Sequence, residues 1–305
     1  MTKKVTRDES ATRAGPRAAA AAAAGRKPLD EEIDIYGLTH KGKVRPSNQD
    51  HFLICSLRKH MDVLQTSLPD ISALTGGNER ISVLAMVADG VGSTALGEEA
   101  ARRAVADVSA YVAYSMNCYY TADPKGESSF AQSLERAAWL CHEELAKAST
   151  ADGRKAMATT LTLLLGIWPR IYLLQVGDSR YYLLRSGKLT QISRDQTMAQ
   201  DLADAGIIAR KDIPNSQWAN VLSSAIGGPQ TAPVVTAIDN TWDSTHLLCS
   251  DGLTKHVPDD QIQDRLRSMT SSRQVCEQLL QDALDQGGTD NITIVVGRAS
   301  QKPKP

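Results

Sequence analysis

The sequence ATTLTLLLGIWPRIYLLQVGDSRYYLLRSG, residues 158–187, contains three apolar runs separated by two short turns. The runs are rich in Ile, Tyr, Thr and Leu, and the turns carry Pro, Asp and Ser, which are frequent where the chain reverses. Connections this short join antiparallel strands, because a parallel pair needs a much longer crossover. Residues 158–167, 170–177 and 180–187 are therefore predicted to form an antiparallel meander.

Further strands and helices are expected on both sides of this meander. The expected strands cover residues 33–39, 51–57 and 81–89, a segment ending at Asp251, and residues 292–297. The expected helices cover residues 97–114, 130–148, 258–266 and 274–284, and residues 195–220 mix helical and loop signals. Because the helices gather between groups of strands and do not alternate with them, the order of elements predicts an α+β domain.

The first 30 residues differ in composition from the rest of the chain. Residues 1–28 hold seven Lys or Arg residues against two Asp or Glu residues, and they include the alanine tract Ala18–Ala24. A helix this short is marginal in water, so residues 1–30 are predicted to be a disordered basic tail. Residues 31–299 are expected to form one domain, with 58–79 as an inserted connection and 300–305 as a C-terminal tail.

Charge and cysteine content argue against several classes of protein. The net charge of −1 provides no basic excess for binding nucleic acid or anionic lipid. No apolar run approaches the roughly 20 residues that cross a bilayer. The five cysteines form no C-x-x-C pair, and none precedes an arginine by six positions as in a thiolate phosphatase loop. We therefore expect a cytoplasmic protein without a membrane span or a nucleic-acid partner.

Five aspartates stand where apolar runs end or turns begin. They are Asp50, Asp89, Asp178, Asp251 and Asp290. Each one alone has an ordinary explanation as a turn residue. Together they suggest a site for a hard divalent cation, because carboxylates without His or Cys neighbours are the ligands such ions prefer. Arg45, five residues before Asp50, adds a planar cationic group suited to the oxygens of a phosphate.

Seven strings occur in a fixed order between Ile33 and Arg298. They are GLTHKGKVRPSNQDHFLI, VADGVG, ATTLTLLLG, QVGDSRYYLLRSGKL, NVLSSAIGG, CSDGLT and GGTDNITIVV. In this set and order the chain resembles the bacterial form of the metal-dependent Ser/Thr protein phosphatases, the PPM or type 2C family. The resemblance implies a central β-sandwich of two antiparallel sheets flanked by α-helices, a four-layer αββα arrangement with the metal ions at one end.

The resemblance also implies a role for each residue of the site. The implied metal ligands are Asp50, Asp89, Gly90, Asp178, Asp251 and Asp290, and the implied phosphate-binding residue is Arg45. Asp89 would bridge two core ions, Mn²⁺ or Mg²⁺, with the Gly90 carbonyl completing one shell. Asp251 and Asp290 would bind the first ion and Asp50 would serve the second. Asp178 would hold a weaker third ion together with Asp251.

Several positions depart from the family pattern without removing an implied ligand. Gln49 stands where many relatives carry Glu, Ser93 replaces a usual Gly, and Gln196 replaces a frequent His. Val91 occupies the position of a His proposed as general acid in other members, so the proton donor to the leaving group stays open. His256, beyond the CSDGLT string, is expected to be structural more often than catalytic.

The function implied by the resemblance is hydrolysis of phosphoserine and phosphothreonine by a metal-bridged hydroxide. The expected partners are phosphorylated proteins, either a bacterial Ser/Thr kinase or its targets, and the expected state is a monomer. Residues 196–220 match the variable flap of the family and are expected to select protein substrates. Two alternatives stay open. One is a phosphoprotein-binding protein with an inactive site, and the other is a metallohydrolase acting on small phosphate esters.

Overall fold

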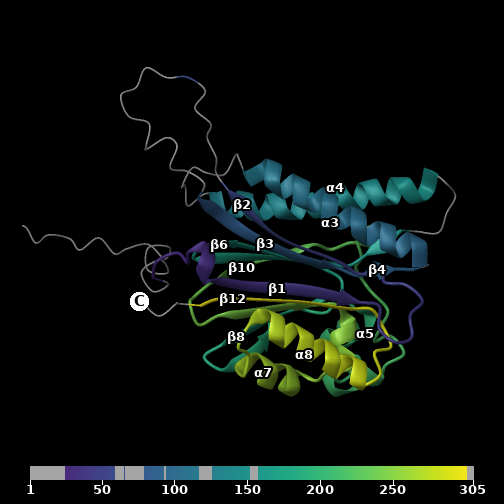
Figure 1. The fold of residues 1–305 in the computed structure, drawn as a ribbon. Coiled ribbons are helices and arrows are strands. Elements are labelled where there is room, and N and C mark those ends of the chain that lie inside the picture. The colour runs from purple at the N-terminus through teal and green to yellow at the C-terminus, as the bar shows by residue number, and fades with distance from the viewer. Residues whose placement is uncertain are drawn as a thin grey trace, which may run out of the picture.

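Two antiparallel sheets lie face to face at the centre of the computed structural model, which describes residues 25–58, 65, 79–92, 94–116, 126–151 and 157–300 (Figure 1). The first sheet has the order β1 (Ile33–His40), β12 (Ile292–Ala299), β11 (Thr245–Cys249), β8 (Arg180–Arg185) and β9 (Lys188–Gln191). The second has the order β10 (Val234–Asp239), β7 (Arg170–Val176), β6 (Leu161–Ile167), β3 (Arg80–Ala88) and β2 (His51–Arg58). A small third sheet pairs β4 (Gly90–Val91) with β5 (Ala158–Thr159).

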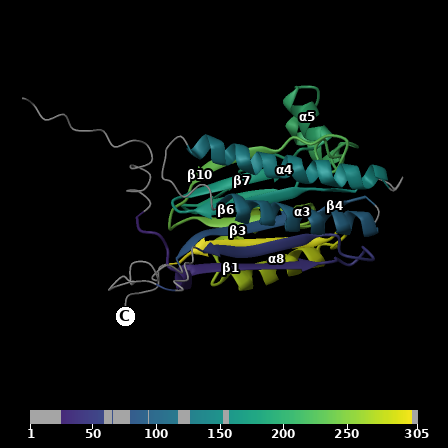
Figure 2. The same ribbon diagram turned by 90° about the horizontal axis from the view of Figure 1, so that it is seen from above.

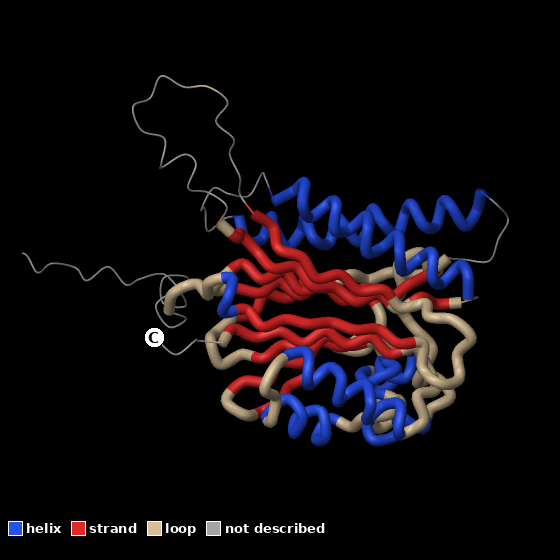
Figure 3. The backbone as a smooth tube through the Cα atoms, viewed as in Figure 1, coloured by secondary structure: helices blue, strands red, loops and turns tan. Residues whose placement is uncertain are grey.

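Helices cover the outer face of each large sheet. Helices α3 (Thr94–Met116) and α4 (Gly126–Ala151) pack on the second sheet, and α7 (Asp259–Arg267) and α8 (Ser272–Asp285) pack against the first (Figure 3). Seen from above, α3 and α4 run side by side along their sheet, and α5 (Met198–Asp204) projects beyond it (Figure 2). The four-layer αββα arrangement implied by the resemblance is confirmed.

Strand β3 shows how the sequence builds three apolar cores between four layers. Because successive side chains of a strand point to opposite faces, its residues divide between two cores. Leu84, Met86 and Ala88 pack with α3 and α4, whereas Ala85 and Val87 face the other sheet. The continuous apolar run over residues 81–89 is therefore explained by burial on both faces.

The predicted meander is correct as three strands but wrong as a single sheet. β6 and β7 pair in the second sheet, and β8 crosses to the first sheet, where it pairs with β11 and β9. Gly177, at φ +101°, begins the turn that carries the chain across. A non-glycine residue rarely adopts this conformation, so the change of sheet depends on glycine at this point.

Several elements differ from the sequence prediction. The expected strand ending at Asp251 stops at Cys249, and Asp251 instead begins the short helix α6 (Asp251–Thr254). Strands β9 and β10 were not expected, because both are short and partly exposed and lack a clear apolar run. Between Met198 and Asn215 the chain forms α5 and a 3₁₀ helix, η2 (Arg210–Asn215).

Residues 25–30, which the sequence places in the tail, contact the domain. Arg80 donates from Nη2 to the Pro28 carbonyl and from Nε to Asp30, at 2.5 and 2.8 Å. Trp242 donates to the Arg26 carbonyl at 3.1 Å, and Asp30–Glu32 forms a 3₁₀ helix, η1. The rest of the expected tail, nearly all of the 58–79 connection and residues 301–305 lie outside the described residues. No described helix is both long and apolar enough to cross a bilayer.

Candidate metal centre

The ends of five strands meet at one edge of the sandwich and carry the five aspartates there. Asp50 and Asp290 come shortly before β2 and β12, and the other three follow β3, β7 and β11. One pocket is lined by Arg45, Asp89, Gly90, Asp178, Asp251 and Asp290, and Asp50 is buried close by. The structure thus brings together all seven residues that the sequence singled out, and their individual roles stay predictions.

Asp50 is buried with only one of its two carboxylate oxygens satisfied. Its Oδ2 accepts hydrogen bonds from the hydroxyls of Ser250 and Thr293, each at 2.7 Å. Its Oδ1 is buried and has no hydrogen-bond partner within the described ranges. Burial raises the pKa of Asp50 to about 6, against the two hydrogen bonds that act to lower it. A buried carboxylate with a free oxygen is suited to a cation.

Asp89 and Asp178 repel the other carboxylates of the pocket. Burial, followed by the charges of Asp50 and Asp251, raises the pKa of Asp89 well above its ordinary value. Burial and the charge of Asp251 likewise raise the pKa of Asp178 to about 7. The backbone of Asp89 is held by Thr160, whose amide donates to the Asp89 carbonyl at 2.9 Å and whose hydroxyl accepts from the Asp89 amide at 3.0 Å. The polypeptide therefore holds these like charges together.

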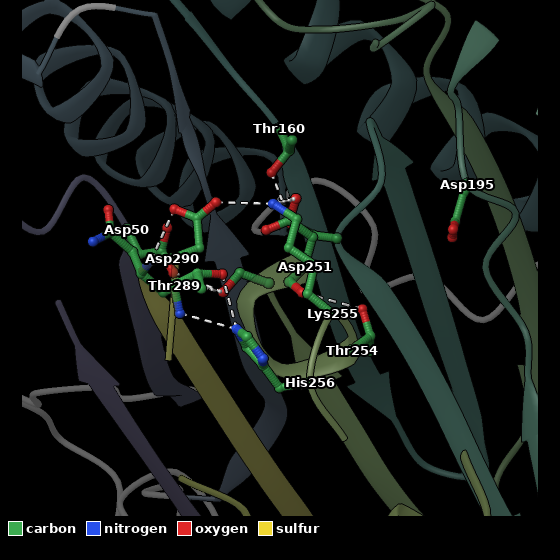
Figure 4. A network of polar contacts seen from close by, with 12 residues as sticks. Asp50, Thr160, Asp195, Asp251, Thr254, Lys255, His256, Thr289 and Asp290 are labelled. Atoms are coloured by element: carbon green, nitrogen blue, oxygen red, sulfur yellow. Dashed lines mark hydrogen bonds and ion pairs between the residues drawn. The ribbon is translucent and has the colours of Figure 1, made fainter. Parts of the chain in front are cut away.

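Asp290 and Asp251 are paired with two cationic side chains. Arg45 meets Asp290 through two hydrogen bonds, from Nε at 2.7 Å and from Nη2 at 2.8 Å. The Lys255 ammonium lies between the two aspartates, 2.5 Å from Asp251 and 2.8 Å from Asp290 (Figure 4). Although burial acts to raise it, the pKa of Asp290 is held down at about 2 by Arg45 and Lys255. Burial raises the pKa of Asp251, and Lys255 opposes that effect.

Lys255 is one residue of the site that sequence reasoning missed. It follows Asp251 by four positions, at the C-terminal end of α6. An Asp and a Lys at this spacing lie on the same face of a helix, so the string DGLTK contained the signal. The signal was not read because Asp251 was expected to end a strand and not to begin a helix.

Asn291 ties the loop that carries Arg45 to the turn that carries Asp290. Its Oδ1 accepts from the Gln49 amide at 2.8 Å, and its Nδ2 donates to the carbonyls of Lys41 and Ser47, each at 2.9 Å. Segments 242 to 250 residues apart are joined in this way. Sequence reasoning gave Asn291 no role in the site beyond its place in a turn.

Two glycines allow these loops to approach each other. A Cβ atom at Gly252 would lie 1.9 Å from the Asn291 carbonyl oxygen, and one at Gly42 would lie 2.2 Å from the Asp290 carbonyl oxygen. Gly42 also has φ +78°, which disfavours other residues. Both positions therefore require glycine for the turn at residues 290–291 to sit where it does.

Two other residues considered in the sequence analysis, His256 and Gln196, form hydrogen bonds with the backbone of neighbouring turns. His256 Nε2 accepts a hydrogen bond from the Thr289 amide at 2.9 Å (Figure 4). Gln196 accepts from the Gly177 amide at 2.7 Å and donates to the Ala232 carbonyl at 2.8 Å. Gln196 thus holds the turn before Asp178, and the expectation that His256 is structural agrees with its contacts.

The donor set of the pocket fits a hard divalent cation. Five carboxylates converge on a region where Arg45 and Lys255 are the only cationic side chains among the described residues that line the pocket. The Oδ1 atoms of Asp50 and Asp251 are buried without a partner among the described residues. Within those same residues, no three His, Cys, Asp or Glu side chains are already grouped as a bound metal ion requires. The carboxylates fit such an ion by chemistry, and their side chains must shift to enclose it.

A model of the family described as protein phosphatase 2C matches residues 70–291. The chain belongs to the protein phosphatase 2C family. Over 142 residues it is 37% identical to the serine/threonine protein phosphatase PstP of Mycobacterium tuberculosis. That match covers 47% of this chain and 27% of PstP, so it spans about a quarter of that relative's length. The resemblance stated from the sequence strings is confirmed.

Solved structures of the serine/threonine phosphatase PstP share the fold of most of this chain. The crystal structure of Mycobacterium tuberculosis PstP superposes with a TM-score of 0.70 at 27% identity and covers 88% of this chain and 99% of that one. A second structure is the catalytic domain of PstP in complex with two manganese ions, with a TM-score of 0.67 at 27% identity. It covers 88% of this chain and 99% of that chain.

Proposed function

We propose that this protein is a metal-dependent protein serine/threonine phosphatase that hydrolyses phosphoserine and phosphothreonine monoesters. The observation that carries the proposal is the set of buried, partly unsatisfied carboxylates in the same pocket as Arg45. Family membership and the manganese ions of the PstP catalytic domain support the same reading. The activity would oppose a bacterial Ser/Thr kinase by acting on the kinase itself or on its targets.

The proposed metal ligands are those implied by the resemblance. Asp89 would serve both core ions, Mn²⁺ or Mg²⁺, and the Gly90 carbonyl would complete the shell of one of them. Asp251 and Asp290 would bind the first ion, and Asp50 would serve the second ion. Asp178 would serve a weaker third ion. When bound, the ions would supply a water of lowered pKa for in-line attack on phosphorus and would offset charge on the phosphate oxygens.

Arg45 would bind and orient the phosphate group of the substrate. Its guanidinium already presents two parallel N–H donors to a carboxylate, and the same fork matches two phosphate oxygens. Half of the Arg45 side chain is exposed, so it can be reached from the pocket mouth. Val91 lines the pocket at the position of the His proposed as general acid in other members, so no side chain is proposed as the proton donor to the leaving group.

The flap at residues 196–220 favours a protein substrate over a small ester. Its Met198 and Asn220 line the pocket, and Ile207 and Trp218 are exposed at 67% and 43%. Arg194 anchors α5 through ion pairs with Asp201 and Asp204, each at 2.6 Å. Exposed apolar side chains beside a catalytic pocket are suited to docking a polypeptide.

The monomeric state and the cytoplasmic location expected from the sequence remain parts of this proposal.

The test compares hydrolysis of a phosphothreonine peptide and of p-nitrophenyl phosphate, with Mn²⁺ and with EDTA. Mn²⁺-dependent turnover of both, with the peptide preferred, would support a protein phosphatase. Turnover confined to small esters would favour the metallohydrolase alternative. Peptide binding without any turnover would favour the inactive binding protein. Asp282→Asn is the matched control for charge-removing variants, because Asp282 pairs with Arg265 between α7 and α8 and does not line the pocket.

A further inference from the structure

The Lys255 ammonium occupies a position between two carboxylates that are assigned above to one metal ion. It lies 2.5 Å from Asp251 Oδ2 and 2.8 Å from Asp290 Oδ2. The side chain of Lys255 is 29% exposed. The single ammonium group of Lys255 thus pairs with one carboxylate oxygen of Asp251 and one of Asp290.

The field of Lys255 extends to a third carboxylate of the pocket. Its positive charge acts to lower the pKa of Asp178, the residue assigned to the weaker third ion. Arg45 approaches Asp290 from its own loop and shares Oδ2 with Lys255. Unlike Arg45, Lys255 also contacts Asp251, so it links the two aspartates directly.

An ammonium at hydrogen-bond distance from these oxygens opposes the binding of a divalent ion that would use them. Two cations at such separation repel each other strongly, and repulsion is weakly screened where carboxylates are buried. Lys255 stands at the C-terminal end of a four-residue helix on a flexible stem, so its ammonium is able to leave without unfolding the loop. Asp251 Oδ1 is buried and has no hydrogen-bond partner in the part of the chain that the structure describes.

We propose that Lys255 is a built-in competitor for the metal site, a tethered cation that must leave Asp251 and Asp290 before a divalent ion binds there. It lowers the affinity for the ion and stabilises the metal-free protein. The inference rests on the proposed function, because it takes Asp251 and Asp290 as metal ligands. It assigns to this chain a residue that sets the metal concentration at which the site fills.

The test is a calorimetric titration of Mn²⁺ into the wild-type protein and into Lys255→Gln, together with thermal unfolding of both without metal. Removing the competing charge should lower the dissociation constant for Mn²⁺ by about tenfold or more, a usual size for coupling between two binding events. The same change should lower the melting temperature of the metal-free protein. Lys255→Arg keeps a positive charge on the two aspartates and should bind Mn²⁺ close to the wild-type affinity.

Lys147→Gln is the matched control, because it removes a lysine paired with Glu144 on the exposed side of α4. Its affinity for Mn²⁺ should equal that of the wild type. Unchanged or weaker Mn²⁺ binding in Lys255→Gln would overturn the competitor role while leaving the proposed function intact. Failure of both the wild type and Lys255→Gln to bind Mn²⁺ would instead refute the metal site itself and the inference with it.

Discussion

Arg45 and Asp290 lie 245 residues apart in the chain, and the guanidinium of one meets the carboxylate of the other through two hydrogen bonds. The antiparallel pairing of β1 with β12 brings these two segments together, with His40 opposite Ile292 at the edge nearest the pocket. A residue assigned to the phosphate and a residue assigned to the metal are therefore already in contact. Substrate binding and metal binding are expected to be coupled through this pair.

Replacing Arg45 should impair substrate binding more than metal binding. In Arg45→Ala the phosphate would lose a two-point, charge-assisted contact, so kcat/KM for a phosphopeptide should fall about 100-fold, mainly through KM. Steady-state kinetics at saturating Mn²⁺ measures this change. Arg273→Ala serves as control, because Arg273 pairs with Glu277 on α8 and does not line the pocket. A fall in kcat alone, with KM unchanged, would contradict the phosphate-binding role.

Asp178 should matter less for metal affinity than the other aspartates. Because Asp178 is assigned only to the weaker third ion, Asp178→Ala should slow turnover while retaining high-affinity Mn²⁺ binding. Calorimetry on Asp178→Ala measures the second of these properties directly. A titration showing no high-affinity Mn²⁺ bound would reverse this division of roles.

A methyl group at Gly252 should destabilise the fold near the site. Its Cβ atom would lie 1.9 Å from the Asn291 carbonyl oxygen, so the turn at residues 290–291 must move. Gly252→Ala should cost about 3 kcal/mol in the free energy of unfolding, in the upper range for overpacking. Urea unfolding measures this loss. At Gly166, in β6, a Cβ meets nothing closer than 3.6 Å, so Gly166→Ala should change stability little. Equal losses in the two variants would contradict the close approach at Gly252.

The buried His246 should make the folded protein less stable in mild acid. Burial lowers the pKa of this histidine from 6.5 to about 4, and its two ring nitrogens contact the Tyr181 hydroxyl and Asn240. Above pH 6.5 the ring is neutral in both states. As the pH falls toward 4, His246 becomes protonated in the unfolded chain but stays neutral in the folded protein, so folding becomes less favourable.

The contribution of His246 can be isolated by comparison with His246→Gln. From pH 7.5 to pH 5 the wild type should lose about 2 kcal/mol more stability than the variant, as the two pKa values imply. Urea unfolding at both pH values gives this difference, and the variant should be less stable than the wild type at pH 7.5. Equal losses of stability in the two proteins would show that the pKa of His246 does not differ between the folded and the unfolded state.

The strands that contain a clear apolar run were predictable from the sequence, because apolar runs and turns report local structure, whereas β9 and β10 lack such a run and were missed. The run over residues 158–187 showed three strands but not that β8 leaves the sheet of β6 and β7, since this depends on Gly177 and on distant pairing with β11. The five aspartates were predictable as a group from their family strings. Lys255 and Asn291 were missed for different reasons. The pair of Lys255 with Asp251 is local, but it lies on a helix that was not expected. The contacts of Lys255 with Asp290 and of Asn291 with Lys41 span 35 and 250 residues, and no local pattern encodes them.

The central claim is that the carboxylates of the pocket hold the ions that drive phosphate ester hydrolysis. The most direct measurement is the turnover of a phosphothreonine peptide as a function of Mn²⁺ concentration, in the wild type, Asp89→Asn and Asp282→Asn. The account predicts saturable Mn²⁺-dependent turnover in the wild type and in Asp282→Asn, and background rates in Asp89→Asn. Turnover that persists in EDTA, or that survives in Asp89→Asn, would contradict it.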